Sequence, residues 1–187
     1  MCCGSWSRRR SGRSAGLRPD TKRSTGQRAR TIMSAISQTE ADALLALPKL
    51  FKDDAPLEFT MTTQMDYERV LLSSDRREEF LLTIERGSRK RARLKYQTRA
   101  RKVVVLARLD LDGPAHRNPL DSPYRANERL PCPHLHLYRE GFDDRIAYML
   151  PDVPQFIVTN PVNGLVWLED FLKFCHVDGV PPIQTTV

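Results

Sequence analysis

The chain has 187 residues and a formal net charge of +7, a length that suits one domain with a core that needs no disulfides or metals. Its four cysteines show no paired C-x-x-C spacing, which excludes a zinc ribbon and a disulfide framework. No continuous apolar stretch is long enough for secretion or for a membrane span, so we expect a cytoplasmic protein without a membrane partner.

The positive charge is concentrated at the N-terminus. Residues 1–32 hold nine basic residues and one acid, whereas residues 33–187 hold 21 basic and 22 acidic residues. The segment is rich in Ser, Gly and Arg and has few apolar residues, so it cannot offset the entropy of ordering, and we expect a disordered tail. The same composition matches an organellar transit peptide. Because ordered patterning begins at Met33, our hypothesis is that an upstream start codon adds residues 1–32 to a single domain at 33–187.

The first predicted element of that domain is a short helix. Ser37-Gln-Thr-Glu40 is a capping box, which predicts a helix start. Ala41, Leu44 and Leu45 then recur at helical spacing, and Pro48 makes a long continuation unfavourable.

Strands are predicted next, because β-branched and alternating residues follow. We expect strands across residues 58–63, 67–72 and 79–85, the last two separated by the turn signal Ser73-Ser-Asp75.

A basic strand is predicted after Gly87. Between Arg86 and Lys102 there are nine basic residues and no acid, and basic and apolar side chains alternate. Such a face is often only solvated, but its regularity favours a stripe that binds a phosphate backbone. The candidate nucleic-acid-binding residues are Arg91, Arg93, Lys95, Arg99 and Arg101.

The C-terminal half completes the predicted sheet. Residues 103–111 favour a central strand, residues 114–131 a long loop, and residues 133–140 and 145–150 further strands. Asn163 is a helix cap before an apolar stripe that ends near Cys175. The pattern predicts an α+β fold with a mainly antiparallel, twisted sheet of about five to six strands and an N-terminal and a C-terminal helix packed on it.

A cluster of titratable residues is expected at one end of this sheet. Strand periodicity places Cys132, His134, His136 and Tyr138 on one face. If the strand at 102–111 pairs with the strand at 133–140, antiparallel geometry brings His116 close to His134.

Three chemical interpretations of this cluster remain open. One histidine as base, one as acid and an arginine as the cation can cleave a phosphodiester without metal. The candidate catalytic residues are His116, His134, His136, Tyr138, Arg108 and Arg139. Alternatively, the histidines are structural, or His-x-His binds zinc or iron together with His116 or Cys132 and a carboxylate of Asp110 or Asp112.

Two longer motifs carry a family resemblance. Residues 108–119 read R-L-D-x-x-G-x-x-H-x-N-P, and residues 133–141 read P-H-x-H-x-Y-R-E-G. The chain from about Met33 onward resembles an uncharacterised bacterial family of small domains that share both motifs. The resemblance implies a bacterial cytosolic protein in which the loop and strand histidines form one signature. Family members usually show Asp after N-P, where this chain has Leu120.

The leading functional hypothesis is an RNA-binding protein that cleaves RNA without a cofactor, in the manner of toxin-like ribonucleases. The alternative is a non-catalytic regulatory module with a protein partner. The third hypothesis is a metal-dependent enzyme with His-x-His ligands.

Overall fold

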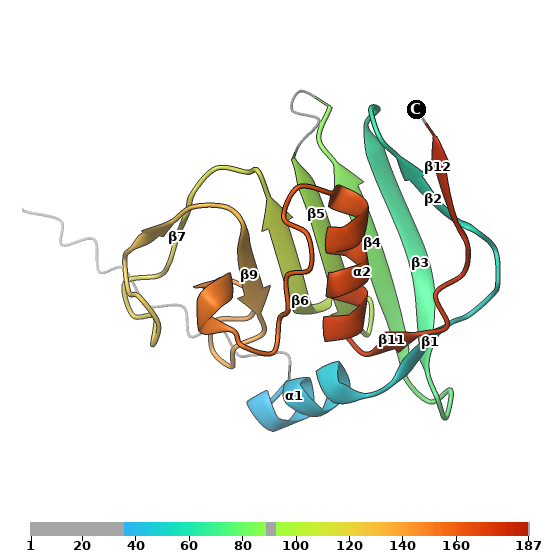
Figure 1. Cartoon of the computed structure of the whole chain (residues 1–187). Coiled ribbons are helices and arrows are strands. Elements are labelled where there is room, and N and C mark those ends of the chain that lie inside the picture. The colour runs from blue at the N-terminus through green and yellow to red at the C-terminus, as the bar shows by residue number, and fades with distance from the viewer. Residues whose placement is uncertain (1–35, 89–92, 187) are drawn as a thin grey trace, which may run out of the picture. The chain divides into compact units, whose positions relative to one another are not determined.

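The computed structural model describes residues 36–88 and 93–186 (Figure 1). The tail expected at residues 1–32 and the candidate Arg91 lie outside the described residues. The fold is α+β, as predicted, with a mostly antiparallel sheet and two α-helices.

Eight strands form the main sheet. From one edge to the other they are β10 (Ala147–Met149), β9 (His134–Leu137), β6 (Val104–Leu111), β5 (Leu94–Ala100), β4 (Glu79–Arg86), β3 (Met65–Ser73), β1 (Lys49–Phe51) and β11 (Val177–Asp178). All neighbours pair antiparallel except β1 and β11. The expectation of about five to six strands was therefore wrong. The strands β1 and β11 have only three and two residues, too few to produce an alternating pattern, whereas β10 at the opposite edge lies within the strand predicted at 145–150.

Two small strand pairs lie outside this sheet. β2 (Leu57–Thr60) pairs parallel with β12 (Ile183–Thr186). β7 (His116–Arg117) pairs antiparallel with β8 (Arg129–Leu130). The segment expected to be a plain loop at 114–131 therefore contains a short strand near each end.

The two α-helices begin at the residues that the sequence indicates. The Ser37 hydroxyl accepts a hydrogen bond from the Glu40 amide at 3.2 Å and caps α1 (Gln38–Ala46). The Asn163 side chain accepts from the Leu165 amide at 2.9 Å and caps α2 (Gly164–Phe174). A 3-10 helix, η1 (Leu150–Asp152), follows β10. Within residues 36–88 and 93–186, no helix is both long and apolar enough to span a membrane.

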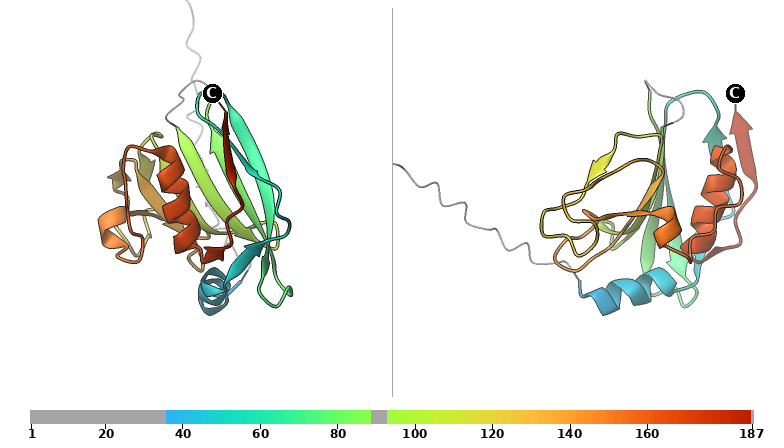
Figure 2. Two further views of the ribbon diagram at one scale, coloured as in Figure 1. Left: turned by 45° about the vertical axis from the view of Figure 1, so that its right-hand side comes forward. Right: turned by 60° about the vertical axis from the view of Figure 1, so that its left-hand side comes forward.

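The helix α2 covers one face of the sheet across β5. The Tyr96 hydroxyl donates to the Gly164 carbonyl at 2.7 Å, and a Cβ on Gly164 would lie only 2.6 Å from Leu94 Cδ1. The helix thus starts close against β5, and a larger residue at this position would require the Leu94 side chain to move. Tyr96, Leu168 and Phe171 are fully buried in the core between the layers. Figure 2 shows α2 on one side of the sheet and β7 on the other.

The face opposite α2 carries two rows of polar side chains that cross five strands. Residues directly opposite each other in an antiparallel ladder share a face. One row contains Asp66, Glu85, Lys95, Asp110 and His134, and the next contains Glu68, Thr83, Gln97, Arg108 and His136. The β9 end of these rows therefore places both histidines next to charged residues of β6.

Candidate functional site

Three imidazoles from two distant parts of the chain meet at the β9 end of the polar face. His134 and His136 lie side by side on β9, with 5.0 Å between ring centroids. The His116 ring lies 5.9 Å from His134 and 4.7 Å from His136. The structure thus confirms that β6 pairs with β9 and that His116 lies close to His134. His134 and His136 are buried, with 1% and 0% exposure, whereas His116 is half-buried.

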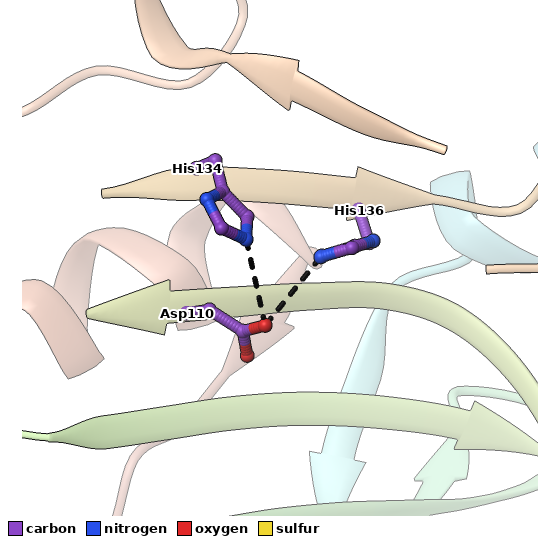
Figure 3. Close-up of side chains that lie close together, drawn as sticks. All are labelled: Asp110, His134 and His136. Carbon is purple, nitrogen blue, oxygen red and sulfur yellow. Dashed lines mark ion pairs between the residues drawn. The ribbon is translucent and has the colours of Figure 1, made fainter. Parts of the chain in front are cut away.

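Both strand histidines are oriented by backbone carbonyls. His134 Nδ1 donates to the Pro131 carbonyl at 3.0 Å, and His136 Nδ1 donates to the Asp144 carbonyl at 2.8 Å. When Nδ1 of an imidazole is bonded to a backbone carbonyl, Nε2 on the far side of the ring points away from that carbonyl. In both residues that nitrogen faces Asp110, with Nε2 to Oδ2 distances of 3.6 Å for His134 and 3.4 Å for His136 (Figure 3).

His116 is positioned by the short strand β7 and by Asn118. The Asn118 side chain is buried, donates to the Ala147 carbonyl at 3.1 Å and accepts from the Ala147 amide at 2.9 Å. It therefore pairs with β10 as a neighbouring strand would. His116 Nε2 donates to the Arg145 carbonyl at 2.9 Å, which leaves Nδ1 as the nitrogen able to accept a proton.

Arg108 is the cation at the centre of the cluster. One terminal nitrogen pairs with the Asp144 carboxylate, and the other donates to His136 Nε2 at 2.8 Å. Its Nε lies 3.3 Å from Asp110 Oδ2. Because His136 accepts from a guanidinium at Nε2 and donates from Nδ1, its ring is neutral in this arrangement.

The neighbours shift the pKa values of the two histidines in opposite directions. Burial alone would lower the pKa of His134, but hydrogen bonds to Asp110, Cys132 and the Pro131 carbonyl raise it to about 9. Burial and then the charge of Arg108 lower the pKa of His136, against the opposing effect of Asp110. Burial alone would raise the pKa of Asp110, but the hydrogen bond from His134 and the charge of Arg108 lower it. At neutral pH the cluster thus contains one charged and one neutral buried imidazole.

A pocket of about 630 Å³ opens beside the cluster. We call it the imidazole pocket; its lining includes His116, His134, Arg108 and Asp110. The remaining charged lining residues are Asp66, Glu85, Arg86, Arg93, Lys95 and Arg117. The lining therefore holds five Arg or Lys side chains against three carboxylates, a composition that favours an anionic ligand.

The same cluster is the metal-ligand candidate within residues 36–88 and 93–186. Donor atoms of Asp110, His134 and His136 all lie within 4.8 Å of one another. However, the Arg108 guanidinium donates to the His136 nitrogen that a metal would need, so a metal ion would have to displace this cation. In the described arrangement Arg108 connects His136 to Asp110 and Asp144.

Tyr138 and Arg139 lie apart from the imidazoles. The Tyr138 hydroxyl donates to the Ile36 carbonyl at 2.6 Å and accepts from the Ile36 amide at 3.3 Å, which ties the segment before α1 to the end of β9. Arg139 is exposed. Both line a second pocket, together with Tyr148 and residues of α1.

The candidate basic stripe is largely neutralised by acids. Lys95 pairs with Glu85 of the neighbouring strand β4 at 2.5 Å, and Arg99 pairs with Glu68 of β3, one strand further along the sheet. Arg101 pairs with Glu40 of α1 at 2.5 Å. The fourth stripe residue that the structure describes, Arg93, is exposed and lines the imidazole pocket. Unlike the other three, it forms no ion pair with a described residue.

Two residues that shape the site were not identified from the sequence. Asp144 holds Arg108 by its carboxylate and His136 by its carbonyl, and in the sequence it is recognisable only as part of a turn. Asn118 lies within the motif H-x-N-P, and this was its only signal. A polar residue in a loop gives no sign that it will be buried.

The family model that matches the chain is described as a family of unknown function, DUF6978, and it covers residues 36–177. This range contains both histidine motifs and the whole described cluster. No curated protein and no solved structure matches the chain. The resemblance to a domain of unknown function is confirmed, and the chain belongs to DUF6978.

Proposed function

We propose that this protein binds RNA in the imidazole pocket and cleaves it by metal-independent acid–base catalysis. The observation that carries the proposal is the meeting of His116, His134 and Arg108 at one pocket. An imidazole that can accept a proton, an imidazolium and a guanidinium are the groups that a transesterification at phosphorus requires.

His116 is the proposed general base. Its Nε2 hydrogen bond to the Arg145 carbonyl leaves Nδ1 free of a proton in the neutral ring. His116 takes the proton of a ribose 2′-hydroxyl, and the 2′ oxygen attacks phosphorus. The bond from phosphorus to the 5′ oxygen breaks, which gives a 2′,3′-cyclic phosphate and a 5′-hydroxyl end.

His134 is the proposed general acid, and Arg108 stabilises the negative charge that develops on the phosphoryl oxygens. With a pKa of about 9, His134 is protonated at neutral pH and gives a proton to the departing 5′ oxygen. His134 lines the imidazole pocket and His136 does not, so we assign His136 a positioning role through its hydrogen bond with Arg108.

Cations at the pocket rim are proposed to bind the flanking phosphates. Arg93 and Arg117 are exposed and line the imidazole pocket, while Lys95 forms an ion pair with Glu85. Since most of the basic stripe is paired with acids, we infer contact with a few phosphates near the scissile bond. Binding should therefore weaken with salt, with a shallow slope.

The test is cleavage of a short end-labelled RNA by the full chain in excess chelator. We expect cyclic phosphate products, no cleavage of the all-deoxy oligonucleotide, and a rate reduced on the order of 100-fold or more in His116→Asn. His176→Asn is the matched control, because His176 is an exposed histidine after α2; its rate should equal that of the wild type.

Three outcomes contradict the proposal. Equal rates in His116→Asn and the wild type would assign the cleavage to a contaminant or to another site. Cleavage that requires added Mn²⁺ or Zn²⁺ would support the metal-dependent alternative. RNA that is bound but left intact under all conditions would support the non-catalytic module, in which the buried histidines are structural.

A further inference from the structure

A buried arginine lies on the otherwise apolar face of the sheet that α2 covers. Arg86 is opposite Met65 of β3 and Leu94 of β5 in the antiparallel ladders, so the three side chains share that face. Arg86 is only 7% exposed, and its guanidinium lies over the Phe59 ring, 5.3 Å from the ring centroid. The proposed cleavage chemistry does not use this cation.

Arg86 lines a pocket of about 460 Å³, which we call the apolar pocket. Sites for small molecules commonly have volumes of this order. The apolar lining residues come from around the end of β2, the adjoining ends of β5 and β6, and the start of α2. They are Phe59, Met61, Leu94, Leu111, Val162 and Trp167, together with two prolines. The pocket therefore combines apolar walls with one buried cation.

The electrostatics of the apolar pocket favour a ligand with one negative charge. Asp112 is the one acid among the described residues that line this pocket, and it is exposed, so solvent screens its charge. Burial raises the pKa of Tyr96, which lies near Arg86, so this phenol stays neutral. A ligand anion beside the buried guanidinium would interact with a positive charge that water screens only weakly.

We propose that the apolar pocket is a binding site for a small monocarboxylic acid with an apolar body, such as a medium-chain fatty acid. The carboxylate accepts hydrogen bonds from the guanidinium of Arg86. The planar fork of a guanidinium carries five N–H donors, so it can bind a carboxylate alongside other partners. The hydrocarbon part packs against the rings of Phe59 and Trp167 and is removed from water, which stabilises the complex.

The composition of the two neighbouring pockets separates their ligands. Arg86, Leu94, Leu111 and Cys132 line both pockets, so the two sites adjoin. The imidazole pocket holds five Arg or Lys side chains and three carboxylates, whereas the charged lining of the apolar pocket is Arg86 and Asp112. A phosphate, with its several charged oxygens, is therefore expected to prefer the imidazole pocket, and an apolar acid the pocket with apolar walls.

The test is isothermal titration calorimetry of the full chain with octanoate, octan-1-ol and octylammonium, which have the same chain length. We expect octanoate to bind with a Kd below about 1 mM and roughly tenfold or more tighter than octanol, with octylammonium weaker still. In Trp6→Phe, which leaves Trp167 as the one tryptophan of the chain, octanoate should change the tryptophan fluorescence with the same Kd. Absence of octanoate binding, equal Kd values for the probes, or unchanged fluorescence would overturn the proposal.

A substitution of an exposed lining residue tests whether octanoate binds in this pocket. Val162 is 90% exposed, so Val162→Asp should fold normally, remove an apolar contact and repel the carboxylate. Octanoate should then bind about fivefold or more weakly. Val103→Asp is the matched control, because Val103 is 77% exposed and lies in the turn between β5 and β6; its Kd should equal that of the wild type. Equal Kd values in the two variants contradict the site.

The role of Arg86 is tested by Arg86→Gln. In this variant the preference for octanoate over octanol should disappear, and a preference retained in the folded variant, as judged by circular dichroism, contradicts the pairing. If the variant does not fold, the probe series and the Val162→Asp comparison decide. Octanoate binding requires no RNA, so this proposal and the proposed function fail separately.

Discussion

His134 is the residue on which the charge state of the site depends. Its two nitrogens are oriented by Pro131 and Asp110, and it is almost completely buried. An imidazolium in such a place stabilises the fold only while it keeps its proton. The ordinary histidine pKa of 6.5 and the folded value of about 9 define the pH window in which this contribution changes.

We therefore predict that the contribution of His134 to stability is complete below pH 6.5 and decreases as pH rises toward 9. Between pH 6.5 and 8 the free energy of unfolding of the wild type should decrease by about 1.5 kcal/mol relative to that of His134→Asn. Urea unfolding of both proteins at the two pH values measures this difference. Parallel stability curves would show that His134 has an ordinary pKa.

At the scale of elements, the side chain of Asn118 connects the end of the strand β7 to the edge of the sheet. Asn118 makes two hydrogen bonds to the backbone of Ala147 and one to the Tyr124 carbonyl. The main sheet ends at β10, and Asn118 satisfies backbone groups at that edge. The position of His116, two residues earlier, depends on this clamp.

We predict that Asn118→Ala destabilises the protein by about 1–3 kcal/mol, because buried backbone groups lose their partners. The Ala147 amide should exchange its hydrogen faster in this variant. Asn160→Ala is the control, because Asn160 is exposed and its side chain accepts a hydrogen bond from the nearby Val162 amide. Unchanged exchange at Ala147 in Asn118→Ala would mean that β10 does not need the clamp.

At the scale of the whole described domain, Lys49 connects the two α-helices to the edge of the sheet. Its side chain is completely buried on β1. Its ammonium group donates to the carbonyls of Leu45, Leu47 and Cys175 at 2.8, 2.8 and 2.9 Å. The C-terminal ends of α1 and α2 are thus connected through the Lys49 ammonium group. Burial lowers the pKa of Lys49 to about 8.

We predict that the contribution of Lys49 to the stability of the protein rises with pH between 8 and 10. A lysine with a lowered folded pKa is penalised while it is charged, and the penalty disappears as pH rises toward the ordinary value of 10.5. The increase should be about 2 kcal/mol relative to Lys49→Met, measured by urea unfolding. Lys52→Met, at an exposed position, should keep the increase. A wild type and a Lys49→Met variant with the same pH dependence would contradict the prediction.

Much of the fold could be predicted from local patterns. The caps at Ser37 and Asn163, the alternation in β4 and the apolar run of β6 are properties of neighbouring residues. Strand periodicity also sufficed to place His134 and His136 on one face. The short strands β1 and β11 were missed because they form through pairing and have little pattern of their own.

The amino-acid sequence by itself determined the α+β class and the two helix starts. It offered the pairing of β6 with β9, which brings His116 to the other imidazoles, only as a condition, and the structure meets that condition. Only the tertiary structure decided the burial of His134 and His136, the role of Asp144 as partner of Arg108, and the neutralisation of the basic stripe by Glu85, Glu68 and Glu40. The physical reason is that periodicity is encoded in adjacent residues. Charge pairing and burial depend instead on register and on loops that bring together residues far apart in the chain.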